Sequence, residues 1–401
     1  MSYVTRVRAI GSVSVAVLLS SVNVQAQQIK KVFVIAMENH NWTQPANQFT
    51  GGIQQIYQNP AAPFINSLVN GTAQVTLGNY TVNISDQVAY AAAYHNVLAT
   101  QSGNNAHIHP SEPNYIWADA GTNFGIANDA DPYPSNVQNT SLHLTGLLDQ
   151  AGVSWKSYQE DTDLATDAGE LINVVRPENQ WTVPLTSLSG VFGDSTFNTW
   201  NGANQYNYAA KHNPMVFFAD TNGNGDTTPA NPMAAHYAPL QQLAGDLENN
   251  AVADYNWITP NQYNDQHTAL SAGYQGLTGD PAKIKQGDDF LKQIVPMIMA
   301  SKAYQDNGVI ILWWDEAEGD GVSGDNADNF NHTVPEIVIS KHVHQNVNGL
   351  PYASPVNLTH SSDLRTMQEI FHVTPLLGDA ANATDLSDLF QPGAIQSEGK
   401  K

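Results

Sequence analysis

The chain has 401 residues, of which 41% are hydrophobic, and a formal net charge of −22 at pH 7. This length and composition suffice for a large buried core, whereas the negative charge repels phosphate backbones and so excludes nucleic acid as a general partner. The chain contains no cysteine, which excludes disulfides, thiolate nucleophiles and cysteine-bound zinc.

The first 26 residues have the pattern of a secretory signal peptide. Arg6 and Arg8 provide a positive start, an apolar stretch follows from about Ile10 to Leu19, and Val24-Gln25-Ala26 offers a small-residue cleavage site. The apolar stretch is about half the ~20 residues that a membrane span needs, so cleavage is favoured over an anchor. No later segment is apolar enough for membrane insertion, and we expect a periplasmic or secreted protein.

Short apolar runs predict a sheet, because most of them lack the alternation of a strand with one solvated face. The predicted strands are Lys31–Met37, Val153–Tyr158, Met215–Ala219, Tyr255–Thr259, Val309–Trp314 and Glu336–Ser340. The predicted helices are Ala62–Asn70, Leu142–Gln150, Pro239–Asn249, Asp288–Tyr304 and a last one from Ser361 to Phe371. This alternation predicts an α/β fold with a mostly parallel central sheet and helices on both faces.

Two regions interrupt the alternation. Residues 159–211 are polar, and residues 319–331 are acidic and rich in glycine. We interpret both as loop insertions near the site within one domain that covers residues 27–401. Residues 220–231 resemble the first half of a calcium-binding loop, but Asn231 stands where a bidentate Glu is expected. A polar turn is the preferred interpretation there, with a calcium site as the alternative.

Oxygen-bearing side chains follow two of the predicted strands. Glu38 and Asn39 come directly after the first strand, and Asp315 and Glu316 directly after the tryptophan-rich one. In open α/β sheets the carboxyl ends of the strands form the binding crevice, so these side chains would meet around one cation. Carboxylates held together need such a cation, because their repulsion otherwise raises their pKa values. Taken singly, each pair also fits the solvated start of a loop.

Ser111 is the candidate nucleophile. It lies between Pro110 and Pro113, which restrict the backbone around it. A rigid turn can aim a hydroxyl at a metal, which lowers the pKa of that hydroxyl and makes it a nucleophile. Taken alone, a serine between prolines is equally compatible with an ordinary turn.

Four histidines lie where they could contact a phosphoryl group: His212, His267, His332 and His360. Histidine at a strand end can bind phosphate as imidazolium or protonate a leaving group. A core or surface histidine is the simpler interpretation of any one taken singly. We assign that simpler role to His40, His143, His236, His342, His344 and His372.

Seven short motifs occur in order between about Lys30 and Phe390. They are Glu38–Gln44, His109–Tyr115, Lys211–Pro214, Ile258–His267, Trp314–Glu316, Asn331–His332 and Leu364–Thr366. Together they resemble the motifs of the bacterial phosphoesterase family of acid phosphatases and phospholipases C, within the alkaline phosphatase superfamily.

This resemblance implies an alkaline-phosphatase-like fold and a set of site residues. The implied metal ligands are Glu38, Asn39, Ser111, Asp315 and Glu316. Ser111 would attack phosphorus, and His212 and His267 would contact the transferring phosphoryl group. The implied substrate-binding residues are His109, Asn114, His332 and His360. Because the ligand atoms are oxygens, we expect one hard divalent cation such as Ca²⁺, Mg²⁺ or Mn²⁺.

We therefore expect an exported, metal-dependent phosphoesterase of acid phosphatase type that hydrolyses a small phosphorylated substrate through a phosphoserine. A phospholipase C is the first alternative, and Trp42, Trp117, Trp181 and Trp200 could give it an apolar rim. A non-catalytic calcium-binding surface protein is the second. Glu112, beside the nucleophile where relatives often carry leucine, would repel a phosphate dianion unless it is protonated or turned away.

Overall fold

The computed structural model describes residues 28–43, 55–96, 110–317 and 333–395. The predicted signal peptide and the acidic segment 319–331 lie outside the described residues. In the part that is described, no helix combines the length and apolarity needed to span a bilayer.

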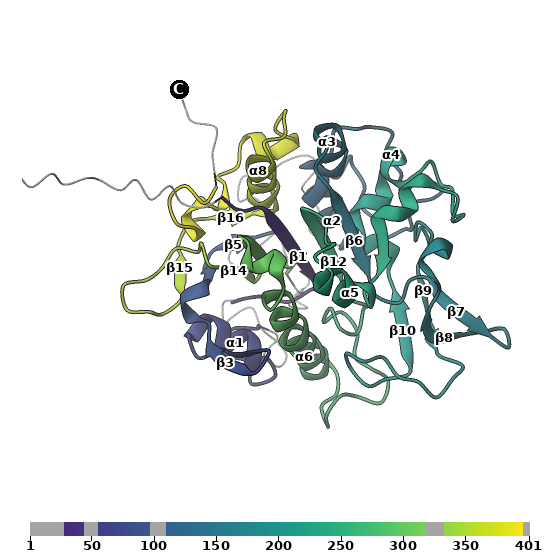
Figure 1. Ribbon diagram of the computed structural model, residues 1–401, viewed down its shortest axis with the longest axis horizontal. Helices are drawn as coiled ribbons and strands as arrows, with labels where there is room; N and C mark the ends of the chain where they lie inside the picture. Colours follow the sequence, from purple (N-terminus) through teal and green to yellow (C-terminus); the bar gives the residue numbers. More distant parts are fainter. Residues whose placement is uncertain (1–27, 44–54, 97–109, 318–332, 396–401) are drawn as a thin grey trace, which may run out of the picture.

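A central sheet of eight strands organises the molecule (Figure 1). Its spatial order is β11 (Tyr237–Pro239), β6 (Trp155–Gln159), β12 (Tyr255–Thr259), β1 (Lys31–Met37), β13 (Gly308–Trp314), β14 (Glu336–Ser340), β4 (Val88–Ala91) and β15 (Tyr352–Ser354). Neighbouring strands of this sheet are parallel, except that β14 runs antiparallel to both β13 and β4. The prediction of a mostly parallel α/β sheet is confirmed.

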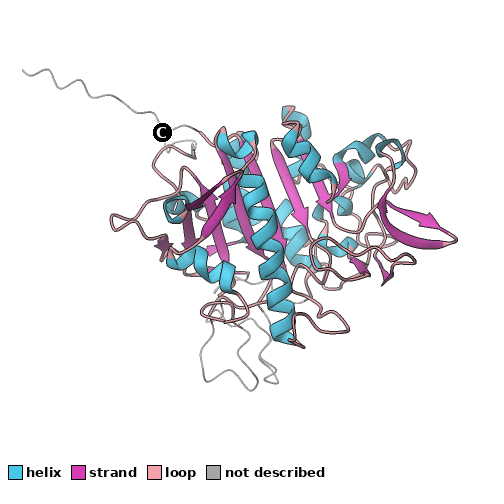
Figure 2. Ribbon diagram, turned by 60° about the horizontal axis from the view of Figure 1, so that its bottom comes forward, coloured by secondary structure: helices cyan, strands magenta, loops and turns pink. Residues whose placement is uncertain are grey.

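The helices surround this sheet in two groups, seen in front of it and above it in Figure 1 and in a turned view in Figure 2. The first group comprises α2 (Glu112–Ala120), α3 (Leu144–Ala151) and α8 (His360–Phe371), which contact one another. The second comprises α1 (Pro63–Asn70), α5 (Gln242–Glu248), α6 (Asp280–Met299) and α7 (Lys302–Gln305).

Two adjacent tryptophans of β13 show that these groups cover opposite faces. Trp313 packs against Tyr115 of α2 and His360 of α8, with ring centroids 5.2 and 4.6 Å apart. Trp314 donates its indole N–H to Gln266 Oε1 at 2.8 Å, and the Gln266 side chain lies against α6. Successive side chains of a strand point to opposite faces, so the sheet is buried on both.

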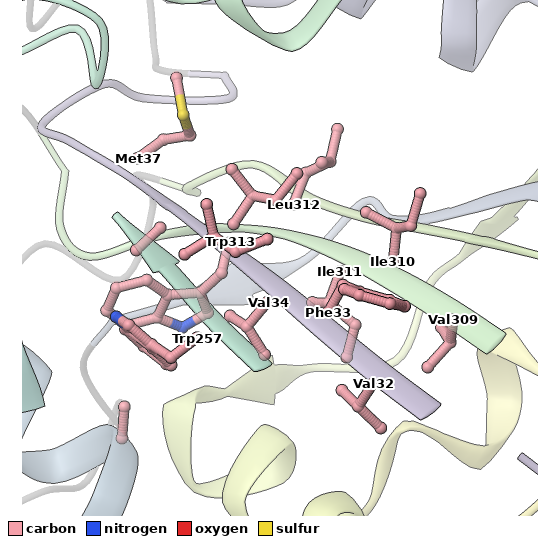
Figure 3. Packing of buried hydrophobic residues seen from close by; sticks show 14 of the residues in the cluster. Val32, Phe33, Val34, Met37, Trp257, Val309, Ile310, Ile311, Leu312 and Trp313 are labelled. Carbon is pink, nitrogen blue, oxygen red and sulfur yellow. The ribbon is translucent and has the colours of Figure 1, made fainter. Parts of the chain in front are cut away.

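The core is densest along β1 and β13. These strands are in parallel register from Lys31 opposite Gly308 to Met37 opposite Trp314, and every residue of β13 is buried. Figure 3 shows Met37 on one side of these strands and Trp313 beside Trp257 on the other. The approach of α6 depends on Gly287, because a Cβ there would lie 2.2 Å from the Gln266 side chain.

One predicted strand is wrong. The apolar run Met215–Ala219 is buried, but it forms a 3₁₀ turn at Pro214–Phe217 followed by α4 (Ala219–Asn222). Pro214 fixes the first φ angle of this turn and provides no N–H for a sheet ladder. A short buried run has the same apolar pattern in a strand and in a turn, so periodicity could not separate the two.

The segment 159–211, predicted to be loop, contains two hairpins. They are β7 (Leu164–Asp167) with β8 (Glu170–Val175), and β9 (Leu188–Val191) with β10 (Gln205–Tyr208). Outside this segment, β2 (Gln74–Leu77) pairs with β3 (Tyr80–Asn83), and β5 (Tyr94–His95) pairs with β16 (Leu358–Thr359). The strands of the hairpins are partly exposed, so they lack the continuous apolar pattern that identified the central strands.

Other boundaries also differ from the prediction. Helix α6 begins at Asp280, eight residues before the predicted start, and α7 is a separate short helix. Helix α2 was not predicted at all. All nine of its residues are buried, so its sequence has no polar face to reveal a helical period.

The segment 220–231 does not bring its oxygens together as a calcium loop would. Asp220 contacts His143, whereas Asn222 donates to the Val216 carbonyl and Asn231 accepts from Met233 N. These side chains complete a turn, in agreement with the preferred interpretation.

His143 ties three elements together on the α2 face of the sheet. Its ring is buried between Asp119, at 3.1 Å from Nδ1, and Asp220, at 2.9 Å from Nε2, and it stacks on Phe218. Burial disfavours the charged ring, but the hydrogen bonds and charges of the two aspartates outweigh it and raise the pKa of His143 to about 9. The protonated histidine therefore joins α2, α3 and α4.

We predict that His143→Gln lowers the free energy of unfolding by roughly 2–3 kcal/mol below pH 6.5, with a smaller loss above pH 9. The raised folded-state pKa means that this stabilisation is complete below the unfolded value of about 6.5 and disappears as the pH rises through about 9. Urea unfolding at pH 6, 8 and 10 measures it, with His372→Asn at the exposed end of α8 as the control. A loss that does not depend on pH would contradict the ion-pair explanation.

Candidate active site

The register of two central strands brings the predicted acidic residues together. Met37 and Trp314 are opposite one another at the carboxyl ends of β1 and β13, so Glu38 and Asp315 emerge side by side. The Asn39 amide donates to Asp315 Oδ1 at 3.1 Å, and the Asp315 amide donates to the Met37 carbonyl at 3.2 Å. Glu38, Asp315 and Glu316 are all buried.

Helix α2 places Ser111 among these side chains. Ser111 occupies the N-cap position of α2, with Oγ 3.1 Å from both Glu38 Oε2 and Glu316 Oε1 and 3.5 Å from Asn39 Oδ1. One turn later Tyr115 donates its hydroxyl to Glu38 Oε1 at 2.7 Å. Because α2 is wholly buried, packing fixes the hydroxyl of Ser111 within an oxygen-lined site.

Asn114, on the same helix, adds an amide to this arrangement. Its Nδ2 donates to Glu316 Oε2 at 3.2 Å, on the oxygen that does not face Ser111. The amide is therefore placed beside the proposed nucleophile, although its proton is directed at Glu316.

His212 and Asp265 complete a second group of potential ligands. His212 Nε2 lies 3.1 Å from Glu38 Oε1, and its Nδ1 lies 3.5 Å from Asp265 Oδ2. One ligand atom from each of these three buried residues lies within 4.8 Å of the others. The imidazole is positioned by stacking on Tyr115, with centroids 4.9 Å apart, and by the Thr259 hydroxyl, which donates to the His212 carbonyl.

Burial and mutual repulsion raise the pKa values of the carboxylates at this site. Burial raises the pKa of Glu38 to about 8, with a further contribution from Glu316, and burial with the charge of Glu38 raises the pKa of Asp315 and Asp265 well above the ordinary value. Burial also lowers the pKa of His212, which favours the neutral imidazole that binds metals.

Several buried atoms at the site make no hydrogen bond within the described part of the chain. They are Asp265 Oδ2, Asp315 Oδ2 and both ring nitrogens of His212. Buried polar atoms are almost always satisfied, so four such atoms around Glu38 indicate a missing partner. Their geometry fits a divalent cation bound by carboxylates, with or without an imidazole.

The remaining predicted residues are placed differently. His267 is only partly buried, with its ring centroid 6.0 Å from that of His212 and its Nδ1 2.9 Å from Thr268 Oγ1. Burial lowers the pKa of His267 to about 4. His109 and His332 lie outside the described residues.

His360 lies behind the strand ends rather than in the site. Its Nε2 is 2.5 Å from the Asp315 carbonyl oxygen, and its Nδ1 is 2.7 Å from the Tyr94 hydroxyl and 3.0 Å from Trp313 Nε1. Both nitrogens thus have partners inside the protein, and the ring is buried. This placement supports Asp315 from behind and offers no nitrogen to a substrate.

Sequence reasoning missed three residues at the site: Tyr115, Lys211 and Asp265. Asp265 could have been found from the sequence, because it stands two residues before His267 in the motif Ile258–His267. In the structure its backbone carbonyl accepts a hydrogen bond from Glu38 N at 2.8 Å, which joins it to the end of β1. Tyr115 and Lys211 also belong to two of the seven motifs, His109–Tyr115 and Lys211–Pro214. The positions of these residues in the sequence do not distinguish a side chain that faces the site from one in the core.

Comparison with known proteins identifies the family. Residues 12–374 match the phosphoesterase family. The chain belongs to this family. It is 29% identical over 221 residues to a probable acid phosphatase of Kluyveromyces lactis, an alignment that covers 53% of this chain and 39% of that protein. It is 24% identical over 336 residues to a phosphatidylinositol-3-phosphatase of Mycobacterium tuberculosis, covering 84% of this chain and 78% of that protein.

The chain spans well under half the length of some of its relatives. A phosphate-repressible acid phosphatase of Penicillium chrysogenum is 25% identical over 52% of this chain, but over only 39% of its own length. Among solved structures, a Vibrio parahaemolyticus protein of the alkaline phosphatase superfamily has 12% identity and a TM-score of 0.44, with 92% of this chain and 74% of that one covered.

We predict that Mn²⁺ or Ca²⁺ raises the melting temperature of the protein and that chelation reverses the rise. A cation that binds only the folded state stabilises it by about 2.7 kcal/mol at 100 times its Kd. Asp265→Asn should reduce this rise. It should also stabilise the metal-free protein, because it removes a buried carboxylate that lacks a counterion.

Differential scanning fluorimetry with each cation added singly measures both effects. Asp306→Asn, on an exposed side chain beside α7, is the matched control and should keep the full rise. Equal rises in all three proteins would contradict cation binding at Glu38, His212 and Asp265.

Proposed function

We propose that this protein is a metal-dependent phosphoesterase that hydrolyses phosphate monoesters through a phosphoserine on Ser111. The observation that carries the proposal is the position of Ser111 Oγ, 3.1 Å from two carboxylates of the buried cluster and at the start of α2. Family membership and the names of the relatives support phosphate esters as the substrate class.

In such a reaction, residues of this chain would serve as nucleophile, proton acceptor, metal ligands and proton donor. Ser111 Oγ would attack phosphorus in line with the departing alcohol, and a carboxylate beside it would take up the hydroxyl proton. A divalent cation bound by Glu38, together with Asn39, Asp315 and Glu316 or with His212 and Asp265, would lower the pKa of the serine and offset charge on the phosphoryl oxygens. His267, whose ring is partly exposed, would protonate the departing oxygen, and its pKa of about 4 restricts this role to acidic pH.

Monoester hydrolysis is favoured over the phospholipase C alternative by the placement of the tryptophans. Trp42, Trp117 and Trp181 are buried, and Trp200 packs against Phe290 with centroids 4.9 Å apart. Trp42, Trp117 and Trp181 are therefore not available to form an apolar rim, and Trp200 is only partly exposed. The Mycobacterium relative's name makes phosphoinositide monoesters a substrate to test beside soluble ones.

We also propose export, on the strength of the signal-like pattern at residues 1–26. Amino-terminal sequencing of the protein recovered from the periplasm or the medium of a bacterial host tests cleavage after Ala26. Recovery of an uncleaved chain from the cytoplasm would contradict it.

We predict that Ser111→Ala reduces kcat for a soluble phosphomonoester by at least about 10³-fold, because the nucleophile is removed, while phosphate still binds. Steady-state kinetics on the cation-loaded enzyme and calorimetry with inorganic phosphate measure the two effects. Ser195→Ala, at an exposed position between β9 and β10, is the control. Turnover in Ser111→Ala at the rate of the parent would refute the phosphoserine. If the parent hydrolysed no ester, the result would favour the non-catalytic calcium-binding protein.

We predict that Tyr94→Phe, which removes the hydroxyl partner of His360, weakens cation binding by about 10-fold and leaves KM for the monoester nearly unchanged. Removal of a residue that hydrogen-bonds a metal ligand typically lowers metal affinity by 10- to 100-fold. Titration of the chelated protein with Mn²⁺, alongside kinetics at saturating Mn²⁺, separates the two quantities. A raised KM with unchanged cation affinity would instead indicate that His360 contacts the substrate.

A further inference from the structure

Lys211 is held beside the proposed nucleophile by a single carboxylate. Its ammonium lies 2.6 Å from Asp129 Oδ2, and its side chain is 15% exposed. The other oxygen, Asp129 Oδ1, accepts a hydrogen bond from the Glu112 amide at 3.1 Å. Glu112 directly follows Ser111 at the start of α2, so Asp129 fixes the lysine with respect to the serine.

The charge of Lys211 reaches the whole site. Burial and Glu316 raise the pKa of Glu38, whereas Lys211 acts to lower it, and the lysine likewise opposes the rise at Asp265. Burial acts against the charge of Lys211 itself, but Asp129, and beyond it Glu38 and Asp315, outweigh this effect and raise its pKa. Lys211 is therefore a cation at neutral pH.

Lys211 and its partner Asp129 are more exposed than the carboxylates of the site. The carboxylates of Glu38 and Asp315 are completely buried, whereas Lys211 and Asp129 keep 15% and 32% of their side chains exposed. His212, which contacts Glu38, follows Lys211 directly in the 3₁₀ turn Ala210–His212. The ammonium thus belongs to the more exposed side of the acidic cluster.

A phosphate monoester brings up to two negative charges into this acidic site. Catalysis of phosphoryl transfer consists largely of positioning and charge stabilisation, and lysine commonly supplies a point charge to phosphate oxygens.

We propose that Lys211 binds a non-bridging oxygen of the substrate's phosphoryl group and that Asp129 is the positioning residue that holds it there. This inference rests on the proposed phosphoesterase function. The Asp129 carboxylate remains paired with the ammonium when phosphate binds, so the lysine contacts two anions at once. The contribution of Lys211 should be larger for a dianionic monoester than for a singly charged diester, because the Coulomb attraction scales with the ligand's charge.

The test measures inorganic phosphate binding and turnover separately in the cation-loaded protein. In the Ser111→Ala background, Lys211→Gln should raise the Kd of inorganic phosphate by about 10- to 100-fold, the range for a lost charge-assisted hydrogen bond. Lys211→Arg should raise it only by about 2- to 5-fold, because the charge remains. Asp129→Asn, which keeps an oxygen for the Glu112 amide but loses the ion pair, should give an intermediate value.

Kinetics on proteins that retain Ser111 provide the second measurement. At saturating Mn²⁺, Lys211→Gln should lower kcat/KM by at least 10-fold more for a soluble monoester than for a diester. Lys302→Gln is the matched control, because Lys302 forms a comparable but exposed pair with Asp306. It should behave like the parent in every assay.

The outcomes separate the inference from the function on which it rests. A parent enzyme that hydrolyses the monoester, together with unchanged phosphate binding in Lys211→Gln, overturns the role of Lys211 alone. A lowered melting temperature with unchanged phosphate binding shows that the lysine is structural and overturns it as well. A parent that hydrolyses no ester overturns the proposed function itself.

Discussion

Repulsion among buried carboxylates is the constraint around which this molecule is built. Glu38, Asp265 and Asp315 lie at strand ends or in the loop beside them, are buried, and have raised pKa values for that reason. Isolated from water, such charges are unfavourable unless a cation or a proton offsets them. The neutral imidazole of His212 and the nearby carboxylate oxygens without a hydrogen bond fit compensation by a cation.

The central sheet holds these buried carboxylates close together despite their mutual repulsion. β1 and β13 are neighbours in parallel register, so their carboxyl ends coincide, and both faces of the sheet are covered by helices. The resulting rigid floor holds the carboxylates in place although they repel one another. Helix α2 is packed on the same floor through Tyr115, which contacts Trp313 and Glu38 at once. The nucleophile and the acidic ligands are thus positioned by one continuous core.

Groups behind and beside the site extend this positioning. His360 links the Asp315 carbonyl to Tyr94 and Trp313. On the solvent side, Asp129 links Lys211 to the start of α2. Glu112, which was expected to repel phosphate, accepts from Asn136 at 2.7 Å, and burial raises its pKa to about 8, so that its repulsion is reduced. His360, Asp129 and Glu112 each influence the charge or the geometry of the proposed phosphoryl site, although none of them is a proposed metal ligand.

Residues local in the sequence determined much of this protein. The continuous apolar runs of β1, β12 and β13 identified the buried strands, and the polar residues after them indicated which end carries the chemistry, because strand period and strand direction are local properties. Only the tertiary structure decided the rest. The run at Met215–Ala219 forms a turn and not a strand. His360 lies behind the site, and Lys211 and Asp265 lie at it. Burial and long-range pairing assigned these roles, and neither is encoded in the spacing of neighbouring residues.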